Sequence, residues 1–265
     1  MAEGFRPGWS AYQVNLFLDE PALWLMERFM KVRSTAGASA WRGKAVEAAA
    51  DLVLFQKADD DAALARAYEV FELDAQGEIS DEIEKARGEI APMLRNLIPS
   101  LRELGVPFSR QAKFTVDVPG VDIQVYGYVD YRFTDWLMDL KSTGKMPSLF
   151  EDGRIKDKAE HLRAMAIYER GLGLRPVLCY VTPGKPDKGK DRKEPLFYTP
   201  HREELDASWR MVEAALRAME RIQNAIEGGR EIGDVAMMYP PRDLAGFRWS
   251  DATRSTATKL WNLGA

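Results

Sequence analysis

Apolar side chains recur at helical spacing through the first hundred residues. A first segment, 21–30, begins with Pro21, which suits the first position of a helix because its fixed φ is already helical and its missing N–H is not needed there. A second segment, 40–56, carries apolar residues every three or four positions, so that they share one face of a helix. This region of the chain is therefore predicted to be helical.

A longer helical pattern covers residues 79–104. Its apolar positions again repeat with the helical period, and Gly105 directly follows the last of them. Pro92 and Pro99 lie inside the pattern, and an internal proline removes a backbone hydrogen bond and clashes with the preceding turn. We therefore expect the helix to be interrupted at both prolines and to stop at Gly105.

The period changes from helical to alternating after Val106. Residues 113–118 and 122–133 alternate apolar and polar side chains, as half-buried strands do. The short segment Thr134-Asp135 then separates the second run from a third, 136–141. Three alternating runs joined by short turns predict a three-stranded antiparallel meander with a two-residue hairpin turn between its last two strands.

The elements after the meander alternate between helix and strand. The chain should end in a tail that packs back on the body, because Trp249 and Trp261 lie within it. Helices and strands in this order predict an α/β fold with a central mixed sheet flanked by helices. The predicted elements are a helix over 157–172, a buried strand over 175–181, a further strand over 194–199 and a long amphipathic helix over 201–227.

Composition is that of an ordinary globular chain and narrows the possible classes. The 265 residues are 46% apolar and 29% charged, which suits a single globular domain over 1–265. The predicted elements divide this domain into a helical N-terminal region (1–105), a sheet core (106–200) and a helical C-terminal region (201–265). No apolar run reaches the roughly 18 residues of a membrane helix, and the first residues contain no apolar core of a signal peptide. The lone Cys179 excludes an internal disulfide, a CxxC zinc site and a four-cysteine iron–sulfur cluster. We expect a cytoplasmic protein with no membrane partner.

Charge is unevenly distributed along the chain. The net charge is −4, but residues 51–89 contain twelve acidic and four basic residues and so carry −8. The rest of the chain therefore carries +4, which leaves room for a basic face. We interpret the acidic stretch as the solvated side of helices. The loop 184–193 holds five basic residues, which suits either contact with phosphates or a solubilising hairpin tip.

The predicted hairpin sets two carboxylates opposite each other. With a two-residue turn at 134–135, Arg132 faces Leu137, and Asp130 faces Asp139. Like charges in such a cross-strand pair repel each other, and apolar neighbours strengthen the repulsion by removing water. A divalent cation would relieve it, because Mg²⁺ binds one or two carboxylates together with phosphate oxygens.

A lysine lies beside this pair of carboxylates. Lys141 is two residues from Asp139 and so points to the same face of its strand. An ammonium group there can orient a water molecule or stabilise negative charge on a phosphate in the transition state. The alternative is that Asp130 and Asp139 are ordinary sheet carboxylates, one of them in a salt bridge with Lys141. The functional interpretation is metal-dependent hydrolysis of phosphodiesters.

These motifs resemble those of the PD-(D/E)xK nuclease superfamily. Gly127-Tyr-Val-Asp130 and Asp139-Leu-Lys141-Ser-Thr match its G-x-x-D and D-x-K-(S/T) pair. Upstream, Trp41-Arg-Gly-Lys-Ala-Val-Glu47 is similar to the R-G-x-x-x-E helix of RecB-like and phage exonuclease members. Downstream, His161-Leu-Arg-Ala-Met-Ala-Ile-Tyr168 resembles their following helix, and the segment 10–24 resembles the start of phage relatives, which ends in P-x-x-W. The resemblance spans residues 10–181.

Two positions depart from the family pattern. Val46 stands where many members have a metal-binding histidine, so Glu47 would have to supply that contribution. Ala164 stands where the downstream helix commonly carries a glutamine, which puts in doubt how water or substrate is positioned rather than whether metal binds.

The resemblance implies a restriction-endonuclease-like core and a set of site residues. Glu47, Asp130, Asp139 and Lys141 would be catalytic. The metal, Mg²⁺ or Mn²⁺, would be held by the three carboxylates and the backbone carbonyl of Leu140. DNA contacts are expected from Arg42, Lys44, Lys145, His161 and Tyr168.

The implied function is a DNA exonuclease of phage or bacterial recombination and repair, in the cytoplasm of a bacterial host and without an iron–sulfur cluster. Its expected partners are DNA, a single-strand annealing or other recombination protein, and further copies of the same chain. One alternative is a nuclease-fold module that binds DNA or assembles with other proteins without catalysis. Another is an endonuclease on the same site that acts on RNA or on particular nucleic-acid structures.

Overall fold

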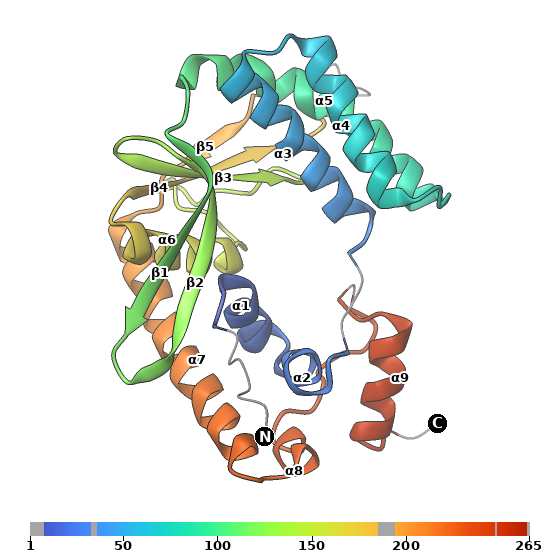
Figure 1. Cartoon of the computed structure of the whole chain (residues 1–265), viewed down its shortest axis with the longest axis vertical. Coiled ribbons are helices and arrows are strands. Elements are labelled where there is room, and N and C mark those ends of the chain that lie inside the picture. Colours follow the sequence, from blue (N-terminus) through green and yellow to red (C-terminus); the bar gives the residue numbers. More distant parts are fainter. Residues whose placement is uncertain (1–7, 33–35, 185–193, 247, 264–265) are drawn as a thin grey trace.

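The computed structural model describes residues 8–32, 36–184, 194–246 and 248–263. A helical N-terminal region leads into a mixed sheet, and further helices follow it at the C-terminal end (Figure 1). This arrangement confirms the predicted α/β class with a central mixed sheet. No helix in the described residues is long and apolar enough to cross a membrane.

The N-terminal helices form two groups. The first group lies beside the lower half of the sheet in Figure 1, and the second packs together over its upper end. The helix within 60–75 was not predicted as a separate element, because its buried positions are mostly alanines and its exposed positions are charged. The helices are α1 (Ala11–Asp19), α2 (Pro21–Leu25), the π-helical turn η1 (Met26–Met30), α3 (Ala38–Gln56), α4 (Asp60–Ala75) and α5 (Asp81–Leu104).

Helix α5 runs without a break through Pro92 and Pro99, so the predicted interruption is wrong. Each proline leaves the carbonyl four residues earlier without its helical partner. Those carbonyls belong to Gly88 and Arg95, which are both exposed, so water can satisfy them. The buried face of α5 is not affected, and the amphipathic pattern prevails over the proline signal.

The described strands form one five-stranded sheet in the order β1-β2-β3-β4-β5. The three-stranded antiparallel meander is confirmed, and β4 then pairs in parallel with β3 after a crossover through α6 (Ala159–Leu172). β5 pairs antiparallel with β4 and completes the mixed sheet. The strands are β1 (Ser109–Val118), β2 (Val121–Arg132), β3 (Trp136–Ser142), β4 (Arg175–Val181) and β5 (Leu196–Tyr198).

The sheet separates two apolar clusters. Leu137 and Tyr180 belong to a cluster with α1, α2, α6 and the C-terminal helices, whereas Met138 and Cys179 belong to a cluster with α3, α4 and α5. Neighbouring residues of β3 and β4 therefore face opposite sides, as strand alternation requires. Cys179 is fully buried, in keeping with a core residue.

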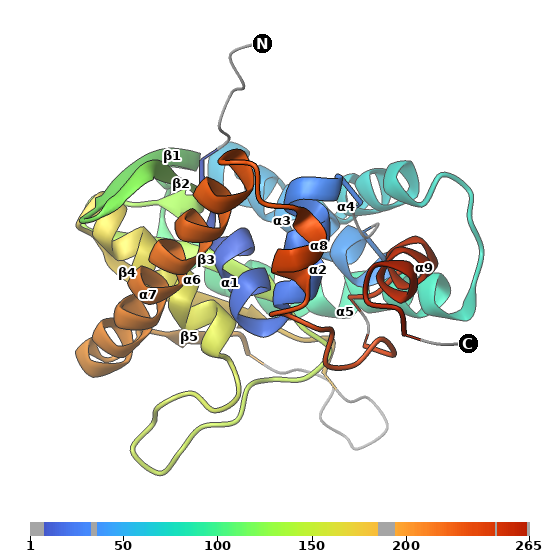
Figure 2. The same cartoon turned by 90° about the horizontal axis from the view of Figure 1, so that it is seen from below.

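The C-terminal region packs back on the body, as predicted. It contains α7 (Arg202–Glu227), α8 (Ile232–Ala236) and α9 (Asp251–Leu260), and the last two lie at the same end of the molecule as α1 and α2 (Figures 1 and 2). Trp249 and Trp261 are buried, and the Trp261 indole donates a hydrogen bond to the Ala236 carbonyl at 2.8 Å. The predicted basic loop 184–193 lies outside the described residues except for Gly184.

Candidate active site

β2 and β3 separate at the two aspartates. Arg132 pairs with Leu137 as predicted and Tyr131 with Met138, and a continuation of this register would set Asp130 opposite Asp139. In an antiparallel ladder every second pair is hydrogen-bonded, so the next rung would join the Leu140 N–H to the Val129 carbonyl. Instead, the Leu140 N–H donates to Oδ2 of Asp130 at 2.8 Å. A side-chain carboxylate thus replaces a main-chain acceptor, and the strands separate at this point.

Asp139 is buried and forms an ion pair with Lys141. Its relative exposure is 2%, and the Lys141 Nζ lies 2.6 Å from its Oδ2. Burial by itself would lower the pKa of Lys141, but the negative charges of Asp139 and Asp130 outweigh it and raise that pKa. Lys141 is therefore protonated at neutral pH, which suits stabilisation of negative charge and not abstraction of a proton.

Asp130 and Glu47 lie beside this ion pair, and the fold disfavours the charged form of both carboxyl groups. Burial, followed by the negative charges of Asp139 and Glu47, raises the pKa of Asp130 well above its ordinary value. Burial also raises the pKa of Glu47, against the opposing effect of a hydrogen bond from Gln111. The fold thus holds carboxylates that a cation or additional donors would stabilise.

Glu47 reaches this region because α3 packs against β2. The Tyr131 hydroxyl lies 3.3 Å from the Glu47 carbonyl and 3.0 Å from Asp51 Oδ1, one helical turn further along α3. Arg110 on β1 in turn pairs with Asp51 at 2.5 Å. These contacts fix the helix against the sheet, so that the Glu47 side chain is held beside the end of β2.

Gln111 joins two of the candidate ligands and was not found from the sequence. Its amide donates to Glu47 Oε1 at 2.6 Å and lies 3.3 Å from Asp130 Oδ1. Its φ of 44° lies in the left-handed region that non-glycine residues rarely adopt. The β1–β2 register places Gln111 opposite Asp130. The strand predicted from the sequence began at residue 113, whereas β1 begins four residues earlier, at Ser109. Gln111 therefore fell outside the predicted strand, and its place beside Asp130 could not be inferred.

His161 and Tyr168 approach the site from α6. Burial, then the positive charges of Lys141 and Lys158, lower the pKa of His161 to about 3, and its Nδ1 lies 2.7 Å from the Tyr180 hydroxyl. His161 is thus neutral at pH 7. Burial, then the charges of Asp139 and Asp130, raise the pKa of Tyr168 well above its ordinary value. Both side chains lie within electrostatic range of the charged residues of the site.

The three predicted basic contacts differ in exposure. Arg42 is buried and ion-paired with Glu89 of α5, so its guanidinium stabilises helix packing and is not presented to solvent. Lys44 keeps 57% of its side chain exposed while pairing with Asp74 at 2.9 Å, and Lys145 is exposed. Their contact with DNA stays a prediction.

The donors fit a magnesium ion only with substrate or water completing its shell. In the described ranges, no three His, Cys, Asp or Glu side chains form a group that could hold a metal ion. Asp130 binds the Leu140 N–H and Asp139 binds Lys141, while Gln111 bridges to Glu47. Mg²⁺ ordinarily takes one or two carboxylates with waters and phosphate oxygens, and Asp139 with the partly buried Asp130 meets that need.

Comparison with known proteins adds no family. No family model matches the chain, and no curated protein matches it. Among solved structures, it is similar to the crystal structure of SSO0001 at 13% sequence identity and a TM-score of 0.30. That similarity covers 77% of this chain and 84% of the other. A likeness this distant supports neither a family nor a function.

Proposed function

We propose that this chain is a Mg²⁺- or Mn²⁺-dependent nuclease of the PD-(D/E)xK type that hydrolyses phosphodiester bonds in DNA, as an exonuclease. The observation that carries the proposal is the fork between β2 and β3. There, Asp130 leaves the ladder to accept from Leu140, and Asp139 is buried against Lys141. A sheet built only for stability would have little use for a buried and a partly buried carboxylate at a broken rung.

Each residue would have a distinct role. Asp130, Asp139 and the Leu140 carbonyl would hold the metal ion, with Glu47 as the further carboxylate from α3. A bound Mg²⁺ would polarise the phosphate and lower the pKa of a water molecule. Lys141, held protonated, would stabilise negative charge on the phosphate oxygens and orient the attacking water. Tyr168 and the neutral His161 would contact the DNA beside it.

End-labelled linear DNA and closed circular DNA, each with and without Mg²⁺, test this function. An exonuclease degrades the linear form only, whereas an endonuclease also nicks the circles. Lys141→Ala should retain metal binding and lose most hydrolysis, because its role is on the reacting phosphate. Asp117→Asn, an exposed carboxylate elsewhere on β1, serves as the matched control and should hydrolyse DNA at the wild-type rate. Cleavage by the wild type without metal would disprove the proposed function. Cleavage by Lys141→Ala at the wild-type rate would disprove the role assigned to Lys141.

Two observations favour a second function, a nuclease-fold module that binds DNA or assembles without catalysis. The described residues hold no group of three that is ready to bind metal, and buried Ala164 stands where the family glutamine would be. Binding to DNA without any metal-dependent product, on linear and circular substrates alike, would establish this module in place of the enzyme.

A further inference from the structure

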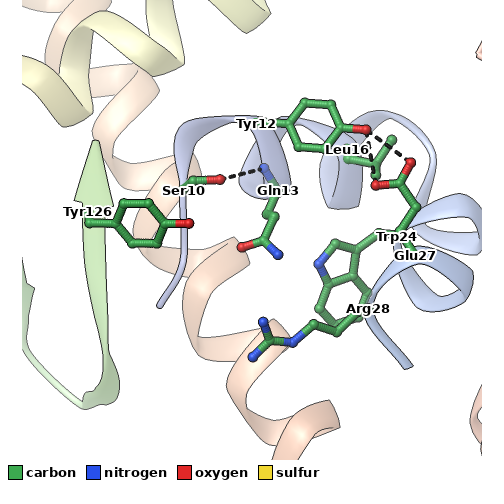
Figure 3. Close-up of a pocket in the computed structure, with 8 residues that line it drawn as sticks. All are labelled: Ser10, Tyr12, Gln13, Leu16, Trp24, Glu27, Arg28 and Tyr126. Carbon is green, nitrogen blue, oxygen red and sulfur yellow. Dashed lines mark hydrogen bonds between the residues drawn. The ribbon is translucent and has the colours of Figure 1, made fainter. Parts of the chain in front are cut away.

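A cavity of about 230 Å³ lies between the N-terminal helices and β2, away from the aspartate pair. Gln13 of α1, Trp24 of α2 and Arg28 of η1 contribute to its lining, and Tyr126 of β2 contributes from another side (Figure 3). The carboxamide and the guanidinium lie between the Trp24 indole and the Tyr126 ring in that view. Four separate elements thus build one polar cavity.

Two polar atoms at this cavity are buried without a partner. Among the residues that the structure describes, the Trp24 indole N–H and the Gln13 Oε1 have no hydrogen-bond partner, although Trp24 is 1% exposed. A buried donor or acceptor without a partner costs on the order of 1–3 kcal/mol, so both call for a ligand or ordered water. Ser10 is already engaged, since its hydroxyl accepts from the Gln13 N–H at 3.4 Å.

The charges of the cavity balance. Arg28 is buried, donates to Gln223 at 2.9 Å and lies 4.2 Å from the Trp9 ring centroid. Glu27 lines the same cavity and accepts from the Tyr12 hydroxyl at 3.0 Å. One positive and one negative side chain leave no excess charge to attract an anion. A neutral ligand that presents an acceptor to the indole and a donor to the carboxamide fits best.

A tyrosine links this cavity to the candidate active site along β2. Tyr126, Tyr128 and Asp130 alternate on the strand, at positions less buried than their neighbours. The Tyr126 and Tyr128 rings are 6.3 Å apart, and Tyr128 is 45% exposed opposite Lys113 of β1. Four residues of strand span about 13 Å. An exposed ring next to a lysine suits a nucleic-acid strand, whose bases stack on aromatic side chains.

We propose that the cavity lined by Gln13, Trp24, Arg28 and Tyr126 binds a nucleobase. A base is neutral and planar, and its edge carries adjacent donors and acceptors that match the unpartnered carboxamide oxygen and indole N–H. Arg28 lies in a π-helical turn, a rare geometry that is often found at functional sites. The base could come from a free nucleoside or from a strand bound at the aspartate pair. The second source rests on the proposed nuclease function.

Calorimetric titration of the full chain in EDTA tests the proposal without any hydrolysis. The probes are adenosine, guanosine, cytidine, thymidine and inorganic phosphate. We expect at least one nucleoside to bind and phosphate not to compete. Gln13→Leu and Trp24→Phe should each weaken that binding about tenfold, the value of one lost hydrogen bond. Trp249→Phe is the matched control, because its buried indole N–H also lacks a partner in the described structure but lies outside the cavity.

A second arm separates the two sources of the base. Single-stranded DNA is titrated in EDTA with and without an abasic position near its end. A strand base in the cavity predicts that the abasic strand binds more weakly to the wild type, and that the difference disappears in Gln13→Leu. Nucleoside binding with no effect of the abasic position supports a free nucleoside as the ligand. Phosphate binding that the two cavity variants abolish, or no binding of any nucleoside or strand that depends on them, overturns the proposal. Neither result depends on whether the chain cleaves DNA.

Discussion

Asp130 and Asp139 differ in what balances their negative charge. Asp139 has the ammonium of Lys141 at 2.6 Å, whereas Asp130 accepts from the Leu140 N–H and the Gln111 amide and is stabilised by Lys141 only through its charge, without an ion pair among the described contacts. We therefore expect Asp130→Asn to raise the unfolding free energy of the metal-free protein by about 1 kcal/mol. Asp139→Asn should lower it by about 3 kcal/mol, because a buried ammonium loses its partner. Denaturant unfolding in EDTA measures both, and equal stabilisation by the two changes would contradict this distinction.

The stability that Asp130→Asn adds to the metal-free protein should depend on pH. Burial, then the charges of Asp139 and Glu47, raise the pKa of Asp130 in the folded protein, so folding favours its protonated form. The stability it contributes is fully present below its unfolded pKa of about 4 and is lost as pH rises through the folded pKa. The gain from Asp130→Asn should therefore be small near pH 4 and grow toward pH 7. Unfolding of both proteins at several pH values in EDTA measures it, and a gain that does not change with pH would contradict the raised pKa.

The packing of α6 on the β1–β2 hairpin depends on one phenylalanine between two glycines. A Cβ added at Gly171 would lie 2.0 Å from Phe114 Cδ2, and one at Gly127 would lie 2.4 Å from Phe114 Cζ. Gly171→Ala should therefore lower the unfolding free energy by about 2 kcal/mol through overpacking. Gly88→Ala, in an open position of α5, is the control and should raise it by about 0.5–1 kcal/mol. Thermal unfolding compares the two, and a neutral Gly171→Ala would show that α6 can shift without loss.

Elements with a clear period could be predicted from the sequence, and so could the hairpin register. The alternation of β2 and the short turn before Trp136 were enough to predict the register in which Arg132 pairs with Leu137. The sequence could not show that the ladder stops before Asp130, because the acceptor for Leu140 changes from main chain to side chain. Gln111 was missed for a related reason. Its segment of β1 lacks regular alternation, and its left-handed φ has no signature in a non-glycine residue.

Charge across the whole molecule is partly neutralised within the N-terminal helices. The acidic stretch 51–89 forms ion pairs that include Asp60 with Arg102, Glu72 with Arg87 and Asp74 with Lys44. These pairs confirm that much of the stretch lies on exposed helix surfaces, as the sequence predicted. They also mean that Lys44 would have to leave Asp74 in order to reach a phosphate.

The salt dependence of DNA affinity tests which charged surface of the molecule contacts DNA. With Ca²⁺ as the metal, the logarithm of the affinity should fall with the logarithm of salt concentration, with a slope of about −0.9 for each duplex phosphate neutralised. Lys44→Gln should flatten the slope by about one unit, and Lys85→Gln, an exposed lysine of α5, should leave it unchanged. A flat dependence in the wild type would mean that the acidic helices face the nucleic acid. The assembly module would then be favoured over the nuclease.

The broken rung between β2 and β3 turns one amide proton into a reporter. The Leu140 N–H is held by the Asp130 carboxylate and not by the main chain, so its exchange with deuterated solvent depends on that carboxylate remaining in place. The neighbouring rung at Tyr131 and Met138 is ordinary sheet and should exchange only when the strands open. A ligand that draws Asp130 away would speed exchange at Leu140 and leave the neighbouring rung slow. The amide resonance of Leu140 would then report occupation of this site in solution, without a chemical probe attached to the protein.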